Sequence, residues 1–366
     1  MLITLAKITA SLAIIGYLFY RAIDTPAGRK AFVEMLDKQK TWGMLAAGFV
    51  VLFIAVTITI VRWWYLVRAL EIDFSLPDAL RIGFLGYLFN LAPAGIVGGD
   101  LLKAWMLARE KPGNRAKSLA SVIVDRIVGL YVLLLVAALG VFLTGFWQIA
   151  DPKVHLVCLA VLAITAVSTA GLALVLIPGF LESRLVQSFT RIPKIGLAIG
   201  SLLEAIVIYR VKRAVLFWTL AATVPVHVLV TLSIYFLALG LGFRAVPCRD
   251  YFTIYPVSGI LGTIPLPAGP QETGIVFLYR TAWMRSPEGG SDERSPQADP
   301  EKSEQQKTAL QKAAQQQGLI LALVCRLSSI LIAPIGGAYY FLGARGEVKE
   351  VMHDLEKDED HPPPPR

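Results

Sequence analysis

Charged residues are scarce in this chain. Asp, Glu, Lys and Arg make up 17% of its 366 residues, whereas a soluble globular domain has about a quarter. Four long stretches hold none of them, namely residues 41–61, 127–150, 154–181 and 214–243. Each stretch is long enough to cross a hydrocarbon core of about 30 Å as a helix. With 55% hydrophobic residues, the chain is predicted to be an all-α polytopic membrane protein rather than a soluble domain.

Cysteines are few and recognisable catalytic motifs are missing. Cys158, Cys248 and Cys325 form neither a disulfide framework nor a C-x-x-C metal spacing, and the four histidines lack ligand spacing. There is no G-x-S-x-G, Walker A or H-E-x-x-H motif and no Rossmann fingerprint. His227 follows Pro225 in an apolar stretch, which is more typical of a packed residue than of a base. We therefore expect no metal or cofactor, and any transport must be passive or driven by an ion gradient or potential.

The apolar stretches predict about six full membrane spans and two interrupted helical segments in one bundle, residues 1–346. The spans are predicted at 2–20, 41–62, 118–147, 154–178, 213–241 and 308–343. The interrupted segments are predicted at 79–108 and 250–283, and the first span is read as an uncleaved helix. Helices on the membrane surface are expected at 21–40 and 180–212. A polar loop is expected at 285–307, and an acidic, proline-rich, disordered tail at 347–366.

Basic residues give the expected orientation. Segments 62–81, 103–117 and 180–213 are rich in Lys and Arg, which places them on the cytoplasmic side with both termini. The 21–40 segment, with five basic residues, does not fit this topology. Arg62 to Tyr65 read as an aromatic belt at the end of a span. The net charge of +8 is explained by loops that touch anionic headgroups, so we expect the cell (inner) membrane and no nucleic-acid partner.

Both interrupted segments contain proline and glycine followed by an acid. The first runs from Asn90 through Pro93, Gly98 and Gly99 to Asp100, with Lys103 one turn later. The second runs from Pro265 through Gly269 to Glu272. Broken helices in hydrocarbon are tolerated only where they pack in protein or line a watery cavity. Paired breaks in two halves of a chain point to the binding site of a transporter, and we predict that these two breaks face each other near the bilayer midplane.

Charges within apolar segments are costly and suggest function by default. They are Asp100, Lys103, Asp125, Arg126, Glu272, Arg280 and Arg326. Each has an alternative interpretation: Asp100 and Glu272 as helix caps, and Asp125 and Arg126 as interfacial residues. The order of break, acid and Arg on the next span occurs in both halves, with Arg126 in the first and Arg326 in the second. This order suggests an inverted repeat.

Two half-helices that meet from opposite sides would offer an anion site at their N-terminal amides. Arg126 and Arg326 would add fixed positive charge suited to the phosphate of a lipid. The acids would hold these arginines when the site is empty, or contact a cationic headgroup. We therefore predict that Arg126 and Arg326 point into the bundle and pair with Asp100, Asp125 or Glu272.

At these residues the chain resembles the lysylphosphatidylglycerol synthase transmembrane-region family, also called flippase-like membrane proteins. The first half carries the resemblance at Asn90, Pro93, Gly98-Gly99-Asp100 and Lys103, and again at Asp125-Arg126. In the second half Pro265, Gly269 and Glu272 keep the register, with Leu266 and Pro267 where the family has glycine. Cys325-Arg326-Leu327 is similar to its last Arg-bearing span.

The resemblance implies an integral membrane protein that moves or handles a lipid. Some members carry a soluble aminoacyl-transfer domain, but the polar segments of this chain are too short to hold one, so we expect no synthase activity. The first hypothesis is a translocase for a phospholipid or polyprenyl-phosphate-type lipid. The second is a scaffold for a lipid-modifying or glycosyltransferase enzyme. The third is a lipid-linked transferase that uses Asp100, Asp125 or Glu272 as a base. The expected partners are lipids with an anionic or phosphate-bearing headgroup.

Overall fold

The computed structural model is helical in every element of the part it describes, which is residues 40–90, 95–177, 206–210, 212–243, 245–264, 269–286 and 300–339, with a few isolated positions besides. The elements are α3 Trp42–Ala69, α4 Leu76–Asn90, α5 Gly95–Glu110, α6 Arg115–Leu143, a 3₁₀ turn Phe146–Gln148, α7 Pro152–Leu176, α10 Arg213–Gly240, α11 Cys248–Leu261, α12 Pro270–Met284 and α13 Pro300–Tyr339. Within these residues, five helices are long and apolar enough to cross a membrane: α3, α6, α7, α10 and α13. The predicted all-α polytopic membrane fold is confirmed.

Five of the six predicted spans correspond to these five helices. The sixth, at 2–20, lies outside the described residues. So do the tail, the predicted surface helix at 21–40 except for Val33 and Lys40, and most of the one at 180–212. Two boundaries were wrong. Helix α3 continues past residue 62 to Ala69, because Leu66 and Val67 extend its buried face. Helix α13 begins at Pro300, inside the predicted 285–307 loop, where proline at the first helical position and several Glu, Lys and Gln residues favour a helix.

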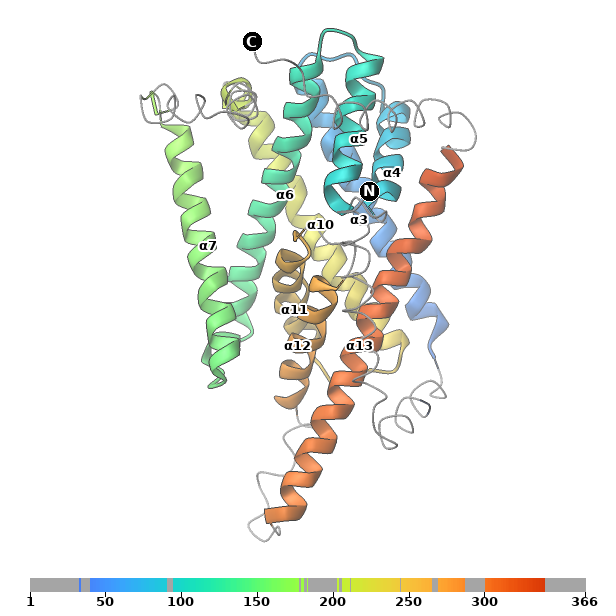
Figure 1. Cartoon of the computed structure of the whole chain (residues 1–366), viewed down its shortest axis with the longest axis vertical. Helices are drawn as coiled ribbons and strands as arrows, with labels where there is room; N and C mark the ends of the chain where they lie inside the picture. The colour runs from blue at the N-terminus through green and yellow to red at the C-terminus, as the bar shows by residue number, and fades with distance from the viewer. Residues whose placement is uncertain are drawn as a thin grey trace, which may run out of the picture.

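Both predicted interrupted segments are helical hairpins. The first consists of α4 and α5, the second of α11 and α12, and the breaks at 91–94 and 265–268 lie outside the described residues. Each hairpin follows a 28-residue helix and precedes another long helix, so the order long, short, short, long occurs twice. Figure 1 shows α4 and α5 in the upper half of the bundle and α11 and α12 in the lower half. The two hairpins therefore enter from opposite ends, as an inverted repeat requires.

The first helices of the two halves, α3 and α10, pack directly against each other. The Ser233 hydroxyl donates to the Gly48 carbonyl at 2.7 Å. A Cβ atom on Gly48 would lie 2.9 Å from the Leu237 side chain, and one on Gly240 would lie 2.6 Å from that of Leu45. Small residues at these positions let the two backbones approach closely, which is how helices associate in membranes, where no hydrophobic force draws them together.

Exposed aromatic side chains mark two levels of the bundle. Trp42 begins α3 and is 76% exposed, while Tyr65 near the other end of that helix is also exposed. They are separated by about 34 Å along a helix, which matches the hydrocarbon thickness of about 30 Å. Trp147, beyond the end of α6, and Trp218, near the start of α10, are exposed as well. These residues fit the aromatic belts of a membrane protein.

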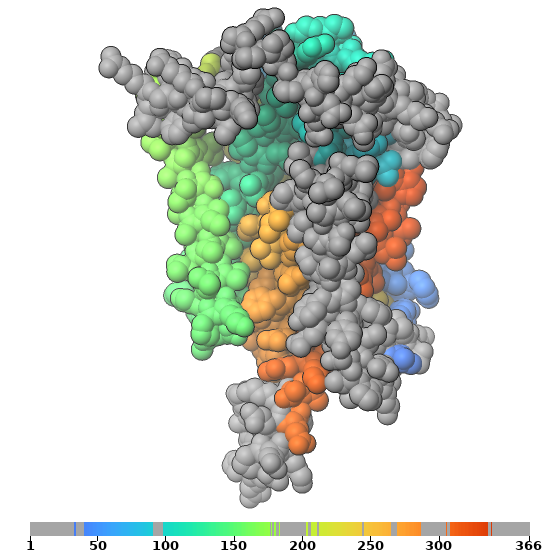
Figure 2. Space-filling model, viewed as in Figure 1, coloured from blue at the N-terminus to red at the C-terminus, as the bar shows by residue number. Residues whose placement is uncertain are grey.

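Helix α7 lies at one edge of the molecule. Figure 2 shows its surface at the left edge of the view, and it packs against α6. Its large outward side chains are apolar and exposed: Leu156, Leu159, Ile164, Val167 and Leu174. In a bilayer such a surface faces acyl chains, so its exposure agrees with a span at the lipid boundary.

A close backbone contact holds α4 against α5. A Cβ atom on Gly99 would collide with the carbonyl oxygen of Gly86 and with the Asn90 side chain. Gly99→Ala is therefore expected to destabilise the protein by about 1–3 kcal/mol, the usual cost of overpacking. Gly171→Ala in α7 is the control, because no atom lies within 4 Å of its added Cβ. Thermal unfolding of the two variants in detergent measures the difference, and equal midpoints would contradict the close contact.

Candidate functional site

Asp100 lies at the centre of the first cluster of charges. It is the sixth residue of α5, and Lys103 one turn later places its Nζ 3.1 Å from Asp100 Oδ1. Arg126 of α6 donates from its Nε to Asp100 Oδ2. The predicted pairing of Arg126 with an acid is therefore present. The capping interpretation of Asp100 is wrong, because α5 begins at Gly95 and Asp100 lies beyond the first turn.

The cations around Asp100 differ in exposure. The Lys103 side chain is 11% exposed, and its ammonium also lies 5.7 Å from the centroid of the Trp63 ring. The Arg126 side chain is 43% exposed. One carboxylate therefore balances two cations, which leaves one excess positive charge in the cluster. Arg126 is the member that faces outward.

Three described residues of the first break, Asn90, Gly98 and Gly99, lie next to this cluster. Asn90 is the last residue of α4, and its buried Oδ1 has no hydrogen-bond partner in the described part of the chain. Gly99 lies against this side chain. Gly98 lies in the first turn of α5. Pro93 lies outside the described residues.

Glu272 has two roles at the second break. Its Oε2 accepts a hydrogen bond from the backbone N–H of Gly269 at 2.7 Å, so it caps the start of α12. Its Oε1 lies 4.0 Å from Nε of Arg326 on α13. Gly269 has φ of 115°, a conformation that favours glycine. The capping interpretation and the predicted Glu272–Arg326 pair are therefore both present.

The end of α4, in the first hairpin, lies next to α13, the helix that carries Arg326. Tyr87, in the last turn of α4, lies close to Ser329 and Arg326 of α13. Helix α4 and helix α13 pack against each other. Because Arg326 also lies beside Glu272, residues from both hairpins meet around one stretch of α13. The two breaks lie outside the described residues, so it stays a prediction that they face each other near the bilayer midplane.

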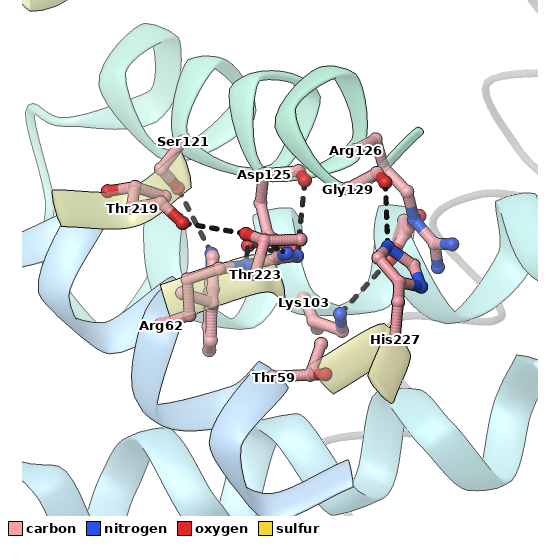
Figure 3. Close-up of polar contacts among 12 residues, drawn as sticks. Thr59, Arg62, Lys103, Ser121, Asp125, Arg126, Gly129, Thr219, Thr223 and His227 are labelled. Carbon is pink, nitrogen blue, oxygen red and sulfur yellow. Dashed lines mark hydrogen bonds and ion pairs between the residues drawn. The ribbon is translucent and has the colours of Figure 1, made fainter. Parts of the chain in front are cut away.

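Arg62 was missed as a member of the buried polar network. Its Nε donates to Asp125 Oδ1 at 2.9 Å, and its terminal nitrogens donate to Thr223 Oγ1 at 2.9 Å and to the Asp125 carbonyl at 3.2 Å. Both charged side chains are almost fully buried. Figure 3 shows this network connecting α3, α6 and α10. Asp125 therefore binds Arg62 and not Arg126 or Arg326.

The aromatic-belt interpretation was wrong for Arg62 and Trp63, and the interfacial interpretation was wrong for Asp125, since all three are buried. Helical periodicity in the sequence was the signal that Arg62 faces the interior. Arg62 follows Ala55 by seven residues and precedes Leu66 by four, so it lies on the buried face of α3. Trp63 uses its indole N–H to reach the Ser121 hydroxyl on α6 at 3.3 Å.

No group of three His, Cys, Asp or Glu side chains in the described ranges is arranged to hold a metal ion. The polar groups that converge are carboxylates paired with cations, together with tyrosine and serine hydroxyls. Such a set can bind an anionic or hydroxyl-bearing group by exchanging its internal ion pairs for contacts with that group.

Comparison with known proteins identifies one family. The family described as Lysylphosphatidylglycerol synthase TM region matches residues 4–291. The match includes both hairpins and Arg126, whereas Arg326 lies beyond it. No curated protein and no solved structure gave a significant match.

Proposed function

Because the chain belongs to the Lysylphosphatidylglycerol synthase TM region family, we propose that it is a lipid translocase that moves a phospholipid or polyprenyl-phosphate-type lipid between leaflets. The family supports a membrane protein that handles lipid. The observation that carries the finer proposal is the Asp100–Lys103–Arg126 cluster on a broken helix, with a partly exposed arginine. A charge within an apolar membrane bundle suggests by default that it serves a headgroup or ion path.

The first cluster suits a phosphate. Arg126 has five N–H donors and can form a bidentate pair with phosphate. When it leaves Asp100 for the headgroup, Lys103 remains 3.1 Å from the carboxylate, so the acid is not left unpaired. The excess positive charge of the cluster favours an anionic headgroup over a neutral one.

The second cluster suits the same exchange. Glu272 caps α12 through Oε2 and faces Arg326 through Oε1. A headgroup phosphate can therefore replace Oε1 at Arg326 while the hydrogen bond to Gly269 remains. The start of α12 keeps its cap, and its conformation does not depend on whether a lipid is bound.

Two alternatives make different demands on the same residues. A transferase needs a carboxylate that is free to act as a base, but Asp100, Asp125 and Glu272 each lie within ion-pair distance of a cation. A scaffold needs no charges on broken helices. The ion pairs of the three carboxylates, together with the charges on the broken helices, favour the translocase. We place it in the cell (inner) membrane with both termini in the cytoplasm, following the Lys- and Arg-rich loops.

Leaflet exchange in liposomes tests the proposal. Purified protein is reconstituted with fluorescent analogues of phosphatidylglycerol, phosphatidylethanolamine, phosphatidylcholine and a polyprenyl phosphate, and dithionite reports the fraction in the outer leaflet. We expect protein-dependent exchange, fastest for lipids with net negative charge. Exchange of every lipid at the protein-free rate, together with transfer of a sugar or amino acid to lipid, would establish the transferase alternative instead.

A further inference from the structure

His227 lies where the halves of the bundle meet, and the headgroup contacts proposed above do not use it. It is on α10, two residues after Pro225, and only 8% of it is exposed. Its Nε2 lies 3.1 Å from the carbonyl oxygen of Gly129 on α6. Because a carbonyl can only accept, Nε2 carries the proton. The other ring nitrogen, Nδ1, is buried and has no hydrogen-bond partner in the described part of the chain.

This arrangement leaves an unoccupied proton acceptor inside the bundle. Buried polar atoms are nearly always hydrogen-bonded, so one without a partner needs an explanation. The pairing with Gly129 fixes the neutral ring in one tautomer, with the Nδ1 lone pair available.

The neighbouring charged and titratable groups come from every element packed against α10. Arg62 of α3 and Tyr255 of α11 lie near His227, and Asp125 of α6 binds Arg62. Figure 3 shows Arg126 of α6 on the same side. Arg326 of α13 is connected to His227 only indirectly, through Tyr87 and Tyr255. The His227 and Tyr255 ring centroids are 6.3 Å apart. Tyr255 in turn lies within electrostatic range of Tyr87. Figure 3 shows His227 directed at Gly129, one turn along α6 from Arg126.

A proton on His227 would change the charge balance at this point. The imidazolium would lie near Arg62, and Asp125, already bonded to Arg62, would have to balance both cations. An anion entering from the Arg126 side would supply the missing negative charge. Binding of the proton and binding of the anion therefore favour each other, and this coupling is reciprocal.

We propose that His227 is a proton-binding site and that a proton travels with each anionic headgroup, which couples lipid movement to the proton gradient. This inference rests on the proposed translocase function and supplies its driving force. Pro225 supports a conformational response, because it removes the backbone donor to the Ala221 carbonyl and weakens α10 just before His227.

The test compares His227→Gln with His155→Gln in liposomes that carry a proton gradient. Glutamine can still donate to the Gly129 carbonyl but cannot take up a proton. His155 is exposed on α7 and serves as the matched control. We expect the gradient to change the exchange of fluorescent phosphatidylglycerol by up to about tenfold per pH unit, the limit for one linked proton, in the wild type and in His155→Gln. His227→Gln should exchange the lipid at a rate that does not depend on the proton gradient.

The outcomes separate the two proposals. The proton-site proposal is overturned if wild-type exchange does not depend on the gradient, or if His227→Gln responds to the gradient as the wild type does. Either result leaves the translocase proposal standing. If no lipid exchanges at all, the translocase fails, and calorimetry then decides the proton site. Phosphatidylglycerol binding is measured in two buffers of different ionisation enthalpy. Uptake of a proton by the wild type and not by His227→Gln supports the site, and no uptake by either protein overturns it.

Discussion

Asp125→Ala is expected to destabilise the protein by about 3–5 kcal/mol, the usual cost of removing one partner of a buried ion pair. Arg62 would keep its hydrogen bond to Thr223 but lose the carboxylate that neutralises it. Because the guanidinium is almost fully buried, water cannot readily replace the lost partner.

Thermal or denaturant unfolding in detergent measures this loss. Asp73→Ala is the matched control, because Asp73 pairs with Arg68 at an exposed site, where removal should cost less than about 1 kcal/mol. The double variant Arg62→Met/Asp125→Leu should recover most of the stability, since replacing both charges with apolar groups removes the uncompensated cation. Equal stability of Asp125→Ala and Asp73→Ala would contradict the buried network.

Arg126→Ala is expected to slow leaflet exchange of an anionic lipid by about ten- to a hundredfold. A hydrogen bond to a charged group contributes about 1.5–3 kcal/mol, and each 1.36 kcal/mol is a factor of ten in rate. Because the Arg126 side chain is 43% exposed and Lys103 still pairs with Asp100, the variant should fold normally. Arg326→Ala should reduce exchange in the same direction.

The control for both variants is Arg68→Ala, which removes an exposed arginine from the end of α3. It should exchange lipid at the wild-type rate. Arg126→Lys should show intermediate activity, because lysine keeps the charge but loses the bidentate geometry. Exchange by Arg126→Ala and Arg326→Ala that matches Arg68→Ala would exclude these arginines from the headgroup path.

The fold was largely predictable because hydrophobic length alone defines a membrane span. The hairpins were predictable because proline and glycine cluster at residues 93–95 and 265–270, whereas single prolines such as Pro225 and Pro334 lie inside continuous helices. The pairing of Arg126 with Asp100 followed from the cost of unpaired charge in hydrocarbon. That argument states that a partner exists but does not select among nearby acids, and Asp125, the sequence neighbour of Arg126, pairs with Arg62.

Arg62 was harder to predict because its neighbours mislead. Arg62 to Tyr65 have the composition of an interfacial belt, and only the packing of α3 against α6 and α10 shows that Arg62 faces inward. The contact between Tyr87 of α4 and α13 was out of reach for a similar reason. It joins residues more than two hundred positions apart, and a local sequence pattern cannot predict a contact over such a separation.

Photocrosslinking of a lipid headgroup is the most direct test of whether headgroups pass between the two hairpins. Phosphatidylglycerol with a photoreactive group on its glycerol headgroup is incorporated with the protein into nanodiscs, irradiated, and the adducts are mapped by mass spectrometry. We expect adducts around Asn90 to Lys103, Arg126 and Arg326, and their loss in Arg126→Ala and Arg326→Ala. Adducts confined to the outward face of α7 and the basic ends of the bundle, unchanged in both variants, would contradict headgroup passage between the hairpins.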